Sequence, residues 1–425
     1  MTARQQGPKL PQGFIFIAFL NFTVGAVLGA VMAVDPAEMP VLAGIHAILN
    51  PYGWLTVLIY GMTFAVLALS LGVRLPTLWQ GWLQLVVAEG GVVLVVVGAS
   101  ASLDWIRRIG VILLVLAPVL FLYNILSGVR YTRKTAGTAQ QVQADAGRLF
   151  GRFAAYRATD AVGQRGTDLS LMIFIVAAVW AAIEDWGAAA GVGLATTSRL
   201  EWLTFYGWIG GTTLSVALHL APRFLGRKVE PAWLWSMLQV AWFGGVLLAE
   251  LGSAFGVSWN RVGSVLVGGA LFVTALRYIQ LSLVRGKHQD DAGETSRVIG
   301  GPGLAAWFTA WGFALVFGGI LVVNGQPFAL SSIHFLFLGF ITSLVYAVGY
   351  TAFPIVLGRS APQPWLGYVQ IACAIIGAAS LIYAFVLFGN GVVNRLLLGA
   401  GGVFAVVGVL GFLAMWAIPS RRRAL

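Results

Sequence analysis

The chain has one cysteine in 425 residues, Cys373, so a disulfide within the chain is excluded. Cys373 lies inside a long apolar run, where a small buried hydrophobic side chain is a commoner role for cysteine than metal ligation. Charged residues are scarce as well, at 10% of the chain. So few charges cannot cover the surface of a soluble globular protein, and that class is excluded.

Apolar residues dominate instead, at 59% of the chain with a mean hydropathy of +0.87. The sequence predicts an all-α, polytopic membrane protein, residues 1–425 forming a single membrane domain. We expect twelve transmembrane helices, because twelve apolar runs can each cross about 30 Å of hydrocarbon. The first run is expected to be a retained helix and not a removed signal peptide. The runs lie near residues 13–34, 43–70, 77–99, 106–129, 168–188, 200–222, 231–252, 260–284, 303–324, 331–355, 364–388 and 395–418.

Acidic residues are the scarcer charged type, with 15 Asp and Glu against 26 Lys and Arg. The basic residues are spread over short loops between the runs, so we expect the lipid bilayer and no nucleic acid as a partner. Basic residues follow every even-numbered run, and the opposite loops carry fewer. By the positive-inside rule, both termini are expected in the cytoplasm.

The two longest polar segments, about 130–167 and 285–300, divide the runs into three groups of four and are expected to be cytoplasmic linkers without a domain of their own. The second run of each group contains a glycine followed by an aromatic residue, at Gly53, Gly207 and Gly339, and Leu-Gly follows nineteen residues later each time. A shared period of this kind predicts duplication. We expect three pseudo-symmetric four-helix units in one orientation, about 13–129, 168–284 and 303–418.

Polar residues inside the runs form two groups. Gln84, Gln239 and Gln370 recur in the third run of each unit, which is typical of hydrogen bonds between helices. Glu89 and Glu250 are costly in lipid and should face the bundle interior, either along a proton or water path or in a structural hydrogen bond. Arg277 is a candidate to neutralise one of these two carboxylates.

Two of the four histidines occupy matching positions in two units. His46 and His334 lie one to two turns ahead of the pairs that begin with Gly53 and Gly339, at the outer mouths of the second and tenth helices. Imidazoles presented by two membrane helices favour an axial haem clamp. The alternative is that each histidine bonds a backbone group at the interface.

The other two histidines have simpler interpretations. His219 lies near the cytoplasmic end of the sixth run, where a structural or snorkelling role is expected. His288 lies in a charged loop and is expected to be solvated.

With these histidines, the chain resembles subunit I of the haem-copper oxidases, and most of all the cbb-type and nitric oxide reductase branch. In that pattern His46, seven residues before Gly53, and His334, five before Gly339, match the two ligands of the low-spin haem. The resemblance implies one low-spin haem b, a bacterial inner (cytoplasmic) membrane location, and a cytochrome or respiratory-complex subunit as partner. A similar second-helix pattern occurs in small membrane proteins linked to nitric oxide stress in denitrifiers.

The sequence departs from this family at the oxygen-reducing centre. Ser332 stands where the high-spin haem ligand is expected. The segment EWLTFYGWIGG, in the outer half of the sixth helix, and the segment PAWLWSMLQVAWFGG of the seventh helix have no histidine. We therefore expect no copper and no catalytic residues of an oxygen-reducing centre. The resemblance leaves open whether the chain is an enzyme.

Accessory residues can also be assigned from the resemblance. The family holds haem propionates with basic residues, so Arg395 is the first candidate and Arg107 and Arg108 are the second; the alternative is an ordinary interfacial arginine. Gly53 and Gly339 would leave room for the porphyrin edge or for helix contact.

The leading hypothesis is a membrane haem protein used for electron transfer, redox or gas sensing, or assembly. The alternative is a cofactor-free transporter or scaffold.

Overall fold

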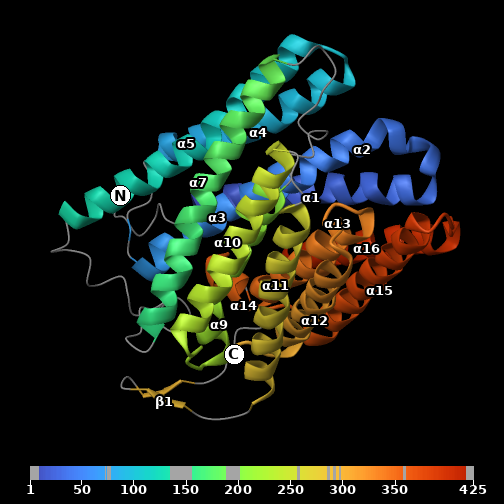
Figure 1. The fold of residues 1–425 in the computed structure, drawn as a ribbon. Coiled ribbons are helices and arrows are strands. Elements are labelled where there is room, and N and C mark those ends of the chain that lie inside the picture. The colour runs from blue at the N-terminus through green and yellow to red at the C-terminus, as the bar shows by residue number, and fades with distance from the viewer. Residues whose placement is uncertain are drawn as a thin grey trace.

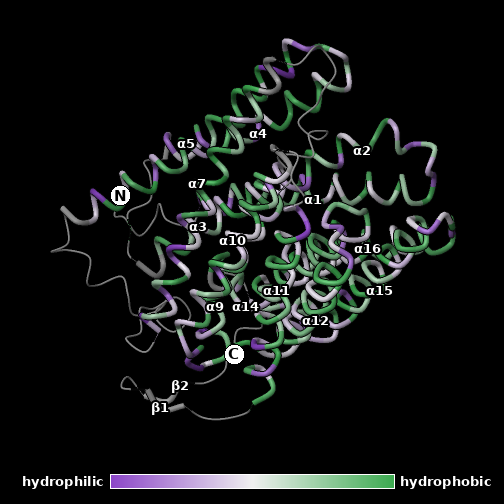
Figure 2. The backbone as a smooth tube through the Cα atoms, in the orientation of Figure 1, coloured by the Kyte–Doolittle hydropathy of each residue, from purple (hydrophilic) through white to green (hydrophobic). Residues whose placement is uncertain are grey.

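The computed structural model describes residues 9–71, 73, 78–134, 156–187, 202–255, 259–284, 288–290, 293–295, 298–357 and 360–417. These residues form a bundle of long helices and one short antiparallel ribbon (Figure 1). Hydrophobic residues extend along most of each long helix (Figure 2). The predicted multi-pass, helical membrane architecture is confirmed at this level.

The elements follow one another in the order α1 (Lys9–Val34), η2 (Pro36–Glu38), α2 (Met39–Ile48), η3 (Leu49–Thr56), α3 (Val57–Leu71), α4 (Leu78–Ser100), α5 (Asp104–Lys134), α7 (Arg157–Gly187), η6 (Trp202–Gly210), α9 (Gly211–Leu225), α10 (Ala232–Phe255), α11 (Trp259–Leu283), β1 (His288–Asp290), β2 (Gly293–Thr295), α12 (Gly301–Asn324), α13 (Leu330–His334), η7 (Phe335–Ile341), α14 (Thr342–Val356), α15 (Pro364–Gly389) and α16 (Arg395–Ala417).

Within the described residues, eleven helical segments are long and apolar enough to cross a membrane. In the region of the predicted sixth span, 200–222, residues 202–225 form a continuous helix, η6 followed by α9, but this helix is not among the eleven. Almost all of its residues are buried by neighbouring helices. A helix enclosed by protein can carry polar residues such as Thr204 and Ser215 that a lipid-facing helix would avoid.

Two helix boundaries differ from the expected ones. α5 continues to Lys134 and α7 begins at Arg157, so the expected linker 130–167 is helical at both ends, and residues 135–155 lie outside the described residues. The start of α7 is polar and was therefore missed. It is helical because Gly163 and Gly166 let it pack closely on Ser215 of α9. The second expected linker, 285–300, contains the short paired strands β1 and β2.

Three π-helical turns occur among the described residues, and they coincide with the three repeated glycines. η3 contains Gly53, η6 contains Gly207 and η7 contains Gly339. A threonine completes two of these turns: Thr56 Oγ1 donates to the Pro51 carbonyl at 2.8 Å, and Thr342 Oγ1 donates to the Phe337 carbonyl at 2.7 Å. π-turns are rare and accompany functional sites more often than ordinary helix does.

The repeated glutamines bond to neighbouring helices, as expected. Asn124 of α5 donates to Gln84 at 2.8 Å, and Gln370 donates to the Gly408 carbonyl of α16 at 3.0 Å. Gln239 donates to Ser215 of α9 at 3.1 Å.

The expected pairing of Arg277 with a membrane carboxylate is wrong. Arg277 donates to the Glu230 carbonyl at 3.1 Å and to Gln280 at 3.3 Å. α10 and α11 are consecutive and antiparallel, so Arg277 near the end of α11 lies level with the start of α10. Glu250 lies near the other end of α10.

Close approach between helices depends on particular glycines. A Cβ at Gly245 of α10 would lie 2.9 Å from both the Gly263 carbonyl and Leu266 Cβ of α11, whereas a Cβ at Gly244 would meet nothing within 4 Å. Small residues at such positions let membrane helices pack without the hydrophobic effect.

Gly245→Ala is therefore expected to destabilise the protein by about 1–3 kcal/mol, because α10 and α11 must separate. Gly244→Ala, one residue away, should be neutral or stabilising by up to about 1 kcal/mol, since alanine is the better helix former. Thermal unfolding in detergent compares the two variants. Equal melting temperatures would contradict the glycine contact.

Candidate functional site

His46 is held by backbone and side-chain contacts near the end of α2. Its Nδ1 lies 2.8 Å from the Gly25 carbonyl of α1, and its ring rests on Gly29, where a Cβ would be 2.9 Å from Cε1. Asn50 Nδ2 donates to the His46 carbonyl at 2.9 Å and lies 3.3 and 3.2 Å from the two ring nitrogens. Near-equal distances place this amide over the ring face, so it is not aimed along the in-plane lone pair of Nε2.

His334 is the last residue of α13. Its Nδ1 lies 2.7 Å from the Leu330 carbonyl, and its ring centroid is 4.4 Å from that of Phe385 on α15. The two rings thus rest on different helices, His46 on α1 and His334 on α15. That they share one site stays a prediction.

Both histidines have the same hydrogen-bonding pattern. A carbonyl oxygen can only accept, so Nδ1 of each ring carries the proton and Nε2 keeps its lone pair. Metal-bound histidines have this arrangement: one ring nitrogen binds the metal, and the N–H of the other ring nitrogen donates to a backbone carbonyl or a carboxylate. His46 and His334 are therefore the residues that would hold a haem iron, each through Nε2.

The η6 helix bonds to both histidine-bearing segments. Trp208 Nε1 donates to Thr56 Oγ1 at 3.0 Å, at the end of the π-turn that follows His46. Tyr206 OH donates to the Pro327 carbonyl at 2.8 Å, in the loop that precedes α13. Ser332, where the resemblance led us to expect a high-spin haem ligand, donates to the Gln326 carbonyl at 2.6 Å, in the same loop. The η6 helix thus contacts both the segment that follows His46 and the loop that precedes His334.

The two expected glycines serve helix contact. A Cβ at Gly53 would lie 2.9 Å from Asn21 Cγ of α1, and a Cβ at Gly339 would lie 2.8 Å from the Phe313 ring of α12. Of the two roles expected for these glycines, the geometry favours helix packing over room for a porphyrin edge.

The expected propionate partners lie in different environments. Arg395 is the exposed first residue of α16, near the end where Phe385 contacts His334, and no partner is seen for it within the described residues. Arg107 is buried and donates to Asp104 at 3.1 Å, and Arg108 lies 3.8 Å from the same carboxylate. Arg395 is the arginine better placed to meet a further anionic group.

The remaining candidates lie elsewhere. His219 Nδ1 lies 3.0 Å from Asp160 Oδ1, and Arg223 holds the same carboxylate through two bonds of 2.8 and 2.9 Å. This cluster ties α7 to α9, in agreement with a structural role for His219. His288 lies in strand β1, and Cys373 is partly exposed on α15.

Sequence reasoning missed the supports on α1. Asn21, Gly25 and Gly29 recur every four residues and therefore share one helix face. That face meets Gly53, Asn50 and His46 in turn. The four-residue spacing was the available signal, but an abundance of glycine in the whole chain obscured it.

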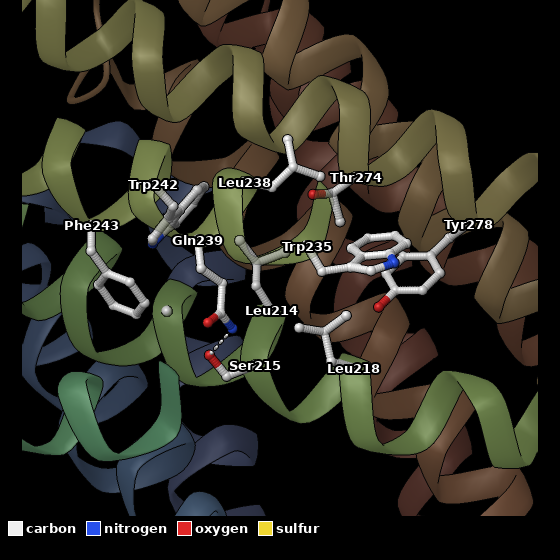
Figure 3. A pocket seen from close by; sticks show the side chains of 11 residues that line it. Leu214, Ser215, Leu218, Trp235, Leu238, Gln239, Trp242, Phe243, Thr274 and Tyr278 are labelled. Carbon is white, nitrogen blue, oxygen red and sulfur yellow. Dashed lines mark hydrogen bonds between the residues drawn. The ribbon is translucent and has the colours of Figure 1, made fainter. Parts of the chain in front are cut away.

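A separate small cavity lies between α9, α10 and α11 (Figure 3). Its volume is about 20 Å³, which is enough for one water molecule. Gln239 and Ser215 bond to each other on its wall, and Tyr278 lines the far side. It is too small for a porphyrin.

Among the described residues, no group of three or more His, Cys, Asp or Glu side chains could hold a metal ion. No protein-family model matches the chain, and no curated protein shows significant similarity to it. Function is therefore argued from the geometry of the two imidazoles.

Tyr206→Phe is expected to lower the stability by about 1–2 kcal/mol, because the buried Pro327 carbonyl loses its donor. Tyr60→Phe is the matched control: the buried Tyr60 hydroxyl has no hydrogen-bond partner among the described residues, so its removal should be neutral or stabilising. Chemical or thermal unfolding in detergent distinguishes the two. An equal effect of both substitutions would contradict the proposed support of the α13 loop.

Proposed function

We propose that the chain is a membrane haem protein in which His46 and His334 hold one low-spin haem b. The observation that carries this proposal is the shared geometry of the two rings, each of which has Nδ1 on a backbone carbonyl and so keeps the lone pair of Nε2. When bound, the haem supplies a one-electron redox centre.

Two histidine ligands leave no open coordination position on the iron. This favours electron transfer or redox sensing over substrate chemistry, with gas sensing requiring displacement of one imidazole. The chain's own residues orient the ligands: Gly25 and Leu330 accept the Nδ1 protons, and Asn50 covers one face of the His46 ring.

The coincidence of η3, η6 and η7 with Gly53, Gly207 and Gly339 supports the three-unit organisation of twelve spans, with η6–α9 as the sixth. It also supports the resemblance to subunit I of the haem-copper oxidases. A bacterial inner membrane location, cytoplasmic termini and a cytochrome or respiratory-complex partner belong to the same proposal.

A cofactor-free transporter or scaffold is the second candidate. It is favoured by Glu89, a carboxyl in the middle of α4 that receives a 2.8 Å hydrogen bond from Asn21. Acidic residues at membrane depth commonly mark ion or proton pathways.

Absorbance spectroscopy of the purified protein decides between these functions. We expect split α and β bands on reduction, and His46→Ala and His334→Ala should each lose most of the bound haem because the iron loses an axial ligand. His288→Ala, in strand β1, is the control and should keep the wild-type spectrum. A folded but colourless wild-type protein would favour the transporter or scaffold.

Arg395→Gln tests the propionate partner. Loss of a cation beside an anionic propionate should weaken haem binding by roughly tenfold and lower the midpoint potential, because the positive charge stabilises the reduced haem. Lys9→Gln, at the first residue of α1, should change neither property. Haem titration measures the affinity, and redox titration measures the midpoint potential. If Arg395→Gln matched the wild type in both, Arg395 would be excluded as a propionate partner.

A further inference from the structure

Glu89 occupies an unusual position for a carboxyl group. It lies at the centre of α4, which spans Leu78–Ser100, and it is only partly exposed. Asn21 of α1 donates to Glu89 Oε2 at 2.8 Å and to the Gly53 carbonyl of η3 at 3.1 Å. One buried amide thus connects the carboxyl to the π-turn that follows His46.

No other charged group faces Glu89 at its own level within the described residues. α5 packs there with Leu113 and Leu114, which meet Gly90 and Gly91 of α4. The charges of α5 lie toward its two ends, with Asp104, Arg107 and Arg108 at one end and Arg130, Arg133 and Lys134 at the other. Glu89 is therefore without a cation to offset a negative charge.

The other neighbouring elements add few titratable groups. α1 carries only Lys9, at its first residue, and the α2–η3–α3 segment carries His46, Tyr52 and Tyr60. α7 approaches nearby through Ala182, with Glu184 and Asp185 following it. Glu89 and His46 are the two acid–base groups that share contacts with one face of α1.

That face of α1 sets the separation between them. Asn21 touches Glu89, and Gly29, eight residues later, touches the His46 ring. At 1.5 Å of rise per residue the two contacts are on the order of 12 Å apart along the helix. In an interior of low dielectric constant, charges at such a separation still interact appreciably.

We propose that Glu89 binds a proton when the haem is reduced and releases it when the haem is oxidised; this rests on the proposed function. Reduction adds one electron to the iron, supplied by a one-electron donor such as a cytochrome. That added negative charge disfavours an ionised carboxylate nearby, so the carboxylate takes one proton from water at the membrane face. Oxidation reverses both transfers.

The test is a redox titration of the purified haem-loaded protein over a range of pH. In the wild type, the midpoint potential should fall as pH rises, because reduction consumes a proton. Glu89→Gln keeps an acceptor oxygen for Asn21 but cannot ionise, so it should lose most of this slope. Glu250→Gln, which removes the carboxyl in α10, is the matched control and should keep it.

Infrared difference spectra, reduced minus oxidised, give a second readout on the unmodified sequence. A carboxylic acid C=O band that shifts on ¹³C-glutamate labelling should appear in the wild type and in Glu250→Gln, and should vanish in Glu89→Gln. The proposal is overturned if Glu89→Gln binds haem and keeps the wild-type slope, or if the wild type shows no such band. A colourless wild type would instead overturn the proposed function and this inference together.

Discussion

The relative position of the two histidine-bearing helices depends on the buried helix formed by η6 and α9. Its Trp208 bonds to Thr56 beyond His46, and its Tyr206 bonds to Pro327 ahead of His334. Both donors come from the π-turn around Gly207, and both are almost fully buried. A helix enclosed by protein is held more firmly than one facing lipid, so it can fix two segments, around His46 and His334, that are far apart in sequence.

The π-turns give this arrangement a common design. A π-turn shifts the side chains that follow it and leaves backbone carbonyls short of helical partners. Thr56 and Thr342 satisfy such carbonyls in the two π-turns that follow His46 and His334. In η6, Gly210 stands three residues after the repeated glycine, as these threonines do, and Trp242 of α10 donates to the Tyr206 carbonyl at 2.9 Å.

Much of the fold could be predicted from the sequence, because apolar runs report lipid contact. The sixth run, 200–222, was predicted in this way too, although among the described residues η6–α9 is not one of the eleven segments long and apolar enough to cross a membrane. The prediction was incomplete at the start of α7, where Asp160 and two glycines make contacts with α9 that no local pattern reveals. The pairing of Arg277 failed for a related reason, since its partner is a backbone carbonyl.

The sequence paired His46 and His334 as expected haem ligands, and that role stays a prediction; the contacts that hold the two rings could not be predicted. His46 and His334 could be paired through the repeat, since each precedes the same glycine-aromatic element. Asn50 and Gly25 could not be assigned, because their roles arise from the packing of α1 against α2 and η3. Glu89 was recognised as costly in lipid, but its connection to Gly53 through Asn21 depends on three helices meeting at one level.

The central claim is that imidazoles from both ends of the chain ligate one iron. Pulsed electron paramagnetic resonance of the oxidised protein, produced with ¹⁵N-labelled histidine, tests it most directly. The account predicts a low-spin ferric signal coupled to two histidine nitrogens, reduced to one or none when either His46 or His334 is replaced. A haem coupled to a single histidine nitrogen in the wild type, or no haem signal at all, would contradict it.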